Sequence, residues 1–221
     1  MKDYSTVFFY LDGTLIDSGE GVFNSVESAL KKFGIEVKDK SKLRCFIGPP
    51  LTVSFKTFYG FDDENADRGV VYYREYYKDK GIFECYVYDG IEECLKRLKD
   101  AGKRVMVATS KPEEYAKRIL EKMGIAKYFD FIAGATMDEK TRANKIAIMQ
   151  YAFDSCGVSS ADTIMVGDRL FDIEGAKHFG MECIAVLYGY GSREEFVQYG
   201  ADYIVSAPND VADLILKNKK K

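Results

Sequence analysis

Histidine is almost absent from this 221-residue chain, and none of its cysteines are paired in a motif. The single histidine, His178, stands in a predicted helix and is interpreted as structural, so catalysis has no obvious histidine base. The five cysteines are scattered without Cys-x-x-Cys spacing, which argues against a cysteine metal site. They are typical of free thiols in a reducing cytoplasm.

Long apolar runs and an excess of one charge are also missing. No run approaches the length that would cross a membrane. The chain has 32 basic and 35 acidic residues, a net charge of -3, which gives no electrostatic case for nucleic acid or an anionic membrane. Its first residues lead into a strand rather than a signal-peptide core. We therefore expect a cytoplasmic protein without nucleic-acid or membrane partners, with a monomer as the default.

Short apolar runs rich in branched residues alternate with helical patterns over most of the chain. Runs that are apolar on both faces are typical of buried parallel strands. Strands alternating with helices predict an α/β fold, a Rossmann-like, doubly wound and mostly parallel sheet. The runs are residues 7–9, 105–108, 131–133, 164–166, 184–187 and 203–205.

The interval from about residue 18 to residue 86 breaks this alternation. It has no strong strand run, and its apolar residues recur at helical spacing, notably over 53–59 and 66–80. Gly48-Pro49-Pro50 predicts a rigid turn between two helices. We predict an all-helical cap domain at 16–87, inserted into a Rossmann-like core formed by 1–15 and 88–221.

Polar residues that could handle a phosphate group follow the first two core strands. Asp12-Gly13-Thr14 comes just after the first strand, and a tight turn there would place reactive groups at the carboxyl edge of the sheet. Thr109-Ser110-Lys111 follows the second core strand. Hydroxyl groups at a strand end, beside the amides that open the next helix, can cradle a phosphate.

Further charged residues follow the later strands. Lys145 opens a predicted helix, and Lys140 lies close by in a loop. Asp168 and Asp172 follow another strand and lie one helical turn apart. Two such carboxylates can bracket a hard cation such as Mg²⁺.

These four motifs, in this order over the full chain, resemble the haloacid dehalogenase superfamily. The position of the insertion is similar to the phosphoglycolate phosphatase and β-phosphoglucomutase branch. Residues 43–51, 187–191 and 201–204 look most like phosphoglycolate phosphatase and 5′-nucleotidase-like members. The resemblance implies a magnesium-dependent phosphatase that hydrolyses a small cytosolic phosphate ester through an aspartyl phosphate.

The resemblance also implies a role for each site residue. Position 10 is that of the nucleophile, and Asp12 would protonate the leaving group. The substrate- or phosphate-binding residues would be Gly13, Thr14, Thr109, Ser110, Lys145 and, from the cap, Arg44. Lys145 would be the cation beside the phosphoryl group, with Lys140 as its competitor. The ligands of Mg²⁺ would be Asp12, Asp168 and Asp172.

The family nucleophile is an aspartate, but Tyr10 holds its place. A phenol with a pKa of about 10 is a poor nucleophile and offers no anionic oxygen to Mg²⁺ at neutral pH. Loss of a nucleophile can cost on the order of 10⁶ in rate. Tyr10 fits a natural substitution, an altered active enzyme, or weak hydrolysis that uses Asp12 and a metal-bound water.

Two other functions therefore stand beside an impaired phosphatase. One is a catalytically silent phosphometabolite-binding or regulatory protein. The other is a phosphosugar mutase, in which the phosphorylated enzyme would have to survive long enough to return its phosphate. The substrate itself is not identified by the sequence.

Overall fold

The computed structural model describes residues 2–138 and 141–217. The chain divides into two compact units. The first, here called the core unit, comprises Met1–Ile16 and Val87–Lys221, and the second, the insertion unit, comprises Asp17–Tyr86. No helix in the described ranges is long and apolar enough to cross a membrane.

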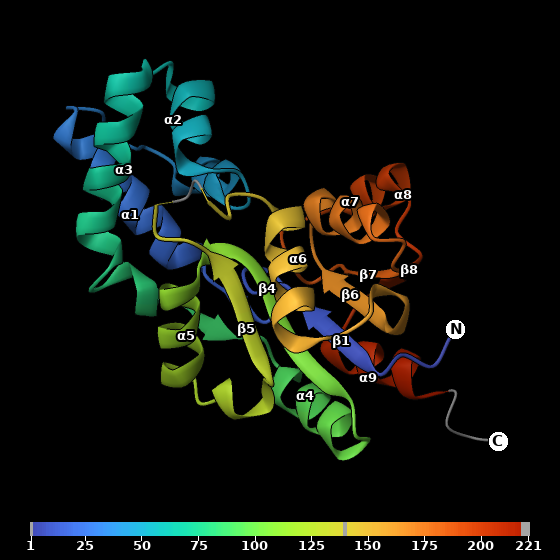
Figure 1. Cartoon of the computed structure of the whole chain (residues 1–221). Coiled ribbons are helices and arrows are strands. Elements are labelled where there is room, and N and C mark those ends of the chain that lie inside the picture. The colour runs from blue at the N-terminus through green and yellow to red at the C-terminus, as the bar shows by residue number, and fades with distance from the viewer. Residues whose placement is uncertain (1, 139–140, 218–221) are drawn as a thin grey trace. The chain divides into compact units, whose positions relative to one another are not determined.

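The core unit is built on a parallel sheet with the order β5-β4-β1-β6-β7-β8 (Figure 1). This confirms the predicted fold class. The strands are β1 (Thr6–Phe9), β4 (Arg104–Pro112), β5 (Phe131–Ala135), β6 (Thr163–Gly167), β7 (Cys183–Val186) and β8 (Tyr203–Val205).

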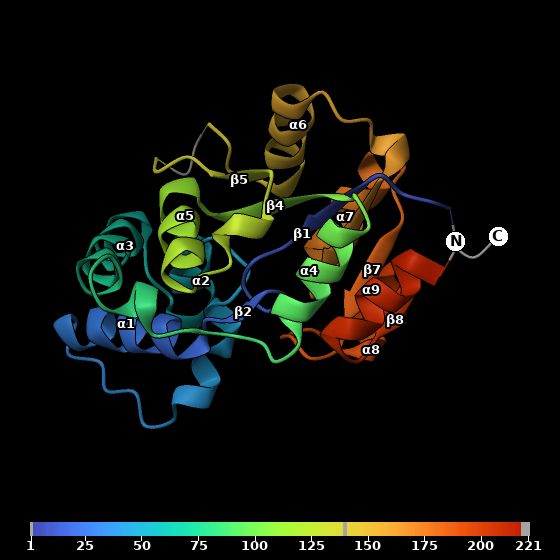
Figure 2. The ribbon, with the colours of Figure 1, turned by 90° about the horizontal axis from the view of Figure 1, so that it is seen from below.

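Helices cover both faces of this sheet, as the two-sided apolar strands require. Figure 2 shows α6 and α4 on opposite sides of it. The helices are α4 (Ile91–Asp100), α5 (Glu113–Lys122), α6 (Lys145–Cys156), α7 (Leu170–His178), α8 (Arg193–Tyr199) and α9 (Pro208–Leu216), with short 3₁₀ turns η3 (Ala126–Tyr128) and η4 (Ser160–Asp162).

The hydrophobic core beneath α6, α7 and α8 includes Tyr10. Phe8 and Tyr10 point to this face because alternate residues of an extended chain share a side. The Phe8 ring stacks on Phe153 of α6 with centroids 5.1 Å apart. Position 10 thus lies where the core meets the carboxyl edge of the sheet.

The insertion unit is helical, with α1 (Gly19–Lys32), η1 (Lys40–Phe46), α2 (Leu51–Tyr59), α3 (Asp63–Tyr77) and η2 (Gly81–Phe83). α3 packs against α1 and α2. It begins three residues before the predicted 66–80 pattern because Asp62 caps it, accepting a hydrogen bond from the Asn65 amide. Its function as a cap stays a prediction.

Two short strands mark where the chain leaves and re-enters the core unit. β2 (Ile16–Asp17) and β3 (Tyr86–Val87) form a two-stranded sheet. They are too short to show as a periodic pattern in the sequence.

Candidate active site

The carboxyl ends of β1, β4 and β6 meet at one edge of the sheet. Phe9 is in register with Val107 of β4 on one side and with Val166 of β6 on the other. The Tyr10 amide continues this pairing by donating to the Val166 carbonyl at 2.9 Å. Residues after these three strands are therefore brought together, as the motif positions predict.

The turn after β1 is closed by its own backbone and by a glycine. The Thr14 amide donates to the Leu11 carbonyl at 3.2 Å, and the Gly13 amide donates to the Ile16 carbonyl at 2.8 Å. Gly13 has φ +84°, and a Cβ there would lie 2.0 Å from Oδ2 of Asp168. Only glycine lets this turn approach Asp168 so closely.

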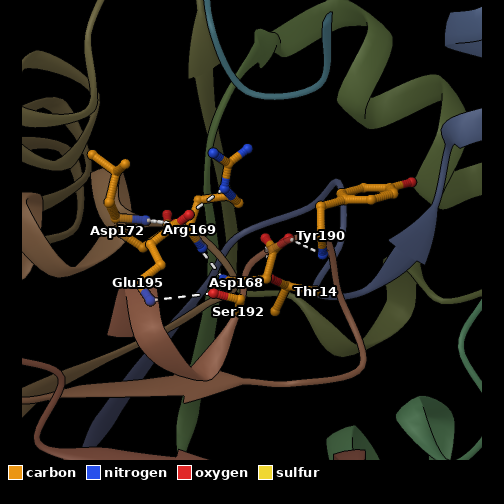
Figure 3. Close-up of polar contacts among 8 residues, drawn as sticks. Thr14, Asp168, Arg169, Asp172, Tyr190, Ser192 and Glu195 are labelled. Carbon is orange, nitrogen blue, oxygen red and sulfur yellow. Dashed lines mark hydrogen bonds and ion pairs between the residues drawn. The ribbon is translucent and has the colours of Figure 1, made fainter. Parts of the chain in front are cut away.

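Asp168 is completely buried, and both of its oxygens accept hydrogen bonds (Figure 3). The Thr14 hydroxyl donates to Oδ1 at 3.1 Å, and the Tyr190 amide donates to Oδ2 at 2.9 Å. Burial, with the nearby charge of Asp172, raises the pKa of Asp168 to about 8, although these hydrogen bonds act in the opposite direction.

Asp172 caps the helix that follows Asp168. Its Oδ2 accepts hydrogen bonds from the amides of Asp168 and Arg169, each at 3.1 Å. This places the carboxylate at the positive end of α7. Its other oxygen, Oδ1, lies 2.7 Å from Nζ of Lys145.

Lys145 is the first residue of α6 and is buried, as an ion-paired lysine can be. Besides Asp172, its ammonium donates to the Ala108 carbonyl at 3.1 Å. It also lies 3.7 Å from the centroid of the Tyr10 ring, a cation–π contact. The competitor Lys140 lies outside the described residues.

Tyr10 is 6% exposed, with its phenol among the acidic groups of the site. Burial, and then the charges of Asp12 and the other carboxylates, hold the pKa of Tyr10 well above 10. The phenol is therefore neutral at physiological pH and cannot act as an anionic nucleophile there.

Asp12 forms an ion pair that the sequence did not reveal. Nζ of Lys111 lies 3.1 Å from Oδ1 of Asp12. β4 continues through Thr109, Ser110 and Lys111 to Pro112, so these residues belong to the strand and do not follow it. Pro112 is the N-cap of α5.

The Thr109 hydroxyl also takes part in the local structure of this strand end. Thr109 is completely buried, and its Oγ1 accepts the Lys111 amide at 3.1 Å. Ser110 lies between them and is half-buried. The second motif thus lies at the end of β4, inside the strand, and its phosphate-binding role stays a prediction.

Two supports for the site were not predicted from the sequence. The Tyr188 hydroxyl donates to the Thr14 carbonyl at 3.0 Å, which ties the loop after β7 to the turn after β1. Oε1 of Glu195 accepts from Arg169 Nε at 3.1 Å and from the Leu170 amide at 2.7 Å (Figure 3). The sequence does contain a signal for Glu195, because Ser192 followed three residues later by a glutamate is typical of a helix start.

Arg44 is exposed in η1 of the insertion unit. It is therefore not one of the residues that the core unit brings together. Its contact with a substrate stays a prediction.

The predicted magnesium ligands differ in how well they suit a cation. In 2–138 and 141–217, no group of three or more His, Cys, Asp or Glu side chains is placed to hold a metal. Asp12 and Asp172 are each paired with a lysine. Asp168 does fit: it is a buried carboxylate, and among the described residues it has no ion-pair partner. A bound cation would offset the free-energy cost of burying this charge.

With the geometry in place, comparison with known proteins identifies the class. Residues 7–186 match the model of the haloacid dehalogenase-like hydrolase family. The chain belongs to this family, which confirms the resemblance read from the four motifs.

Named relatives of this hydrolase family member cover most of its length. It is 41% identical to a 5′-nucleotidase of Pseudomonas aeruginosa over 192 residues, 87% of this chain and 86% of that protein. It is 35% identical over 208 residues to the tyrosine-protein kinase PtkA of Mycobacterium tuberculosis, 94% of this chain and 70% of that one. A crystal structure described as a predicted phosphatase from Clostridium acetobutylicum is 47% identical with a TM-score of 0.93, covering 98% of this chain and all (100%) of that one.

Proposed function

We propose that this chain carries the site of a magnesium-dependent phosphatase for a small phosphate ester, with turnover strongly reduced by Tyr10. The position of Lys145 carries this proposal. Its buried ammonium faces position 10 at 3.7 Å from the ring centroid and is held by Asp172 at 2.7 Å. In an aspartate-bearing site the same ammonium would neutralise a carboxylate nucleophile and the transferred phosphoryl group.

The other groups supply the remaining needs of phosphoester hydrolysis. Asp12, beside position 10 in the same turn, would protonate the leaving oxygen. The Thr109 and Ser110 hydroxyls at the end of β4 would donate to phosphoryl oxygens. Gly13 and Thr14 shape the turn that orients Asp12 and Asp168.

Magnesium would be held by the Asp168 carboxylate and, following the family resemblance, by the main-chain carbonyl of Asp12. When bound, Mg²⁺ would supply positive charge that neutralises the phosphoryl oxygens. Thr14 and Tyr190 hold the Asp168 carboxylate in one orientation for this purpose. Asp172 orients Lys145 and the start of α7.

Tyr10 would reduce turnover in two ways. Its neutral phenol replaces an anionic nucleophile, which can cost on the order of 10⁶ in rate. Its ring also occupies the face of Lys145 that a phosphoryl group would need. We therefore expect the unchanged chain to bind a phosphate ester and to hydrolyse it slowly.

The substrate class is a small phosphoglycolate-like or nucleotide-like ester. The similarity to a named 5′-nucleotidase over 87% of this chain supports the nucleotide end of that range. Arg44 of the insertion unit is the residue we expect to contact the part of the substrate beyond the phosphate.

Phosphate release tests the proposal. The unchanged chain, Tyr10→Asp and Tyr10→Phe are assayed with magnesium on an aryl phosphate, nucleoside monophosphates and phosphoglycolate. We expect release by Tyr10→Asp, and the other two should be slower by several orders of magnitude. Silence of all three contradicts the phosphatase proposal.

The same assay separates the alternatives. Ester binding without release, in Tyr10→Asp as well, would indicate a silent binding protein. Conversion of a phosphosugar to its isomer without free phosphate would indicate a mutase.

A further inference from the structure

Two ion pairs at the candidate site bury both partners. One is Lys145 with Asp172. The other joins Lys111 to Asp12, whose side chains are 8% and 9% exposed. Surface pairs such as Lys117 with Glu113 leave the lysine about half exposed, at 50%.

The Lys111 pair stands in the way of the role proposed for Asp12. Nζ of Lys111 lies 3.1 Å from Oδ1 of Asp12, so the ammonium restrains the side chain that would act on the leaving oxygen. Removing one partner from a buried pair is costly, because it leaves an uncompensated charge. Asp12 is therefore released from Lys111 only when another anion takes the ammonium.

A phosphate ester is an anion of the required kind. It carries up to two negative charges and several acceptor oxygens, so it competes well with one carboxylate for an ammonium. Lys111 is also next to the proposed phosphate cradle, because its amide donates to the Thr109 hydroxyl at 3.1 Å. The phosphate would arrive beside the lysine that restrains Asp12.

We propose that Lys111 binds the phosphate group of the substrate and releases Asp12 when it does so. This inference rests on the proposed phosphatase function and adds a residue to it. Lys111 pairs with the Asp12 carboxylate. When the ester binds, the ammonium moves to a phosphoryl oxygen, and Asp12 is no longer restrained by it. Release of Asp12 is thereby coupled to substrate binding.

The test measures binding of inorganic phosphate, by calorimetric titration with magnesium present. Lys111→Met, Lys111→Arg and Asp12→Asn are each made in the unchanged chain and in Tyr10→Asp. Lys117→Met is the matched control, since it removes an exposed lysine that pairs with Glu113 on α5.

We expect opposite effects from the two members of the pair. Lys111→Met should weaken phosphate binding by about 10- to 100-fold, the loss of one charged hydrogen bond. Asp12→Asn should strengthen it, because no carboxylate competes for Lys111. Lys111→Arg should keep most of the affinity, and Lys117→Met should match its parent. A merely structural ion pair would lower the affinity in both variants.

Because Lys111→Met leaves Asp12 buried without a partner, the double variant Lys111→Met/Asp12→Asn, which removes both charges, is measured as well. It should show the same weak binding. Phosphate affinity in it within about twofold of the control overturns the inference. If Tyr10→Asp still releases phosphate in that case, the proposed function stands. If neither chain binds phosphate and Tyr10→Asp is silent, both proposals fail together.

Discussion

Asp168→Asn is predicted to remove the response of the protein to Mg²⁺ and to raise its stability when the ion is absent. The substitution replaces an ionisable group on a completely buried side chain with a neutral amide of the same shape. It also keeps the hydrogen bonds: the Asn oxygen can accept the Tyr190 amide, and the Thr14 hydroxyl can turn to accept from the Asn nitrogen.

The gain in stability follows from the raised pKa of Asp168. A carboxyl group whose folded pKa is raised from 3.8 to about 8 stabilises the fold below its unfolded pKa and loses that contribution as pH rises through about 8. At about pH 8 the folded protein therefore carries a penalty that asparagine lacks. Even one pKa unit of that shift is worth about 1.4 kcal/mol. For a chain of this size, that is about 3–6 °C in Tm.

Magnesium should raise the stability of the unchanged chain. An ion at a concentration of about 100 times its Kd stabilises the folded state by about 2.7 kcal/mol. This corresponds to a rise of about 5–11 °C in Tm. Asp168→Asn should show less than a quarter of that rise, because the carboxylate proposed to hold the ion is gone.

Thermal unfolding with and without MgCl₂ measures both effects. Asp67→Asn, an exposed aspartate of the insertion unit, controls for the loss of one carboxylate. The reasoning is refuted if Asp168→Asn responds to Mg²⁺ as fully as Asp67→Asn does. It is refuted as well if Asp168→Asn is less stable than the unchanged chain without the ion.

Three further predictions concern the packing of the site. Tyr10→Phe should resist unfolding better than the unchanged chain above about pH 10, because a phenol with a raised pKa loses its stabilising contribution there; alkaline titration followed by circular dichroism measures this. Gly175→Ala should lower Tm, since its Cβ would lie 2.6 Å from Cγ of Lys145 and overpacking costs about 1–3 kcal/mol; a higher Tm would show that Lys145 moves freely. Tyr188→Phe should cost about 1–3 kcal/mol in urea unfolding, because the buried Thr14 carbonyl loses its donor, and an unchanged midpoint would count against that bond.

The parallel sheet could be predicted because its signal is local. Each core strand is a short apolar run, and every predicted run lies in an observed strand or, for Leu187, directly after one. The end of β4 could not be placed in the same way. Thr109 to Pro112 carry polar groups and a proline, which read as a loop, but pairing with β5 extends the strand through them.

The motif residues were found because they follow strands, but their partners were not. Lys111 belongs to the second motif, but no role was predicted for it. Nothing in the sequence indicates that its side chain reaches Asp12. Tyr188 and Glu195 act on residues more than twenty positions away. Such contacts depend on the packing of the loops, which composition and periodicity do not encode.

The most direct test of the central claim asks whether position 10 is where the phosphoryl group is transferred. Tyr10→Asp is mixed with an aryl phosphate and magnesium, quenched rapidly, and reduced with borohydride, which converts an acyl phosphate to an alcohol. Peptide mass spectrometry then locates the reduced side chain. We predict it at position 10, with none in the unchanged chain. Phosphate release by Tyr10→Asp without modification there, or with modification at another carboxylate, would contradict the account.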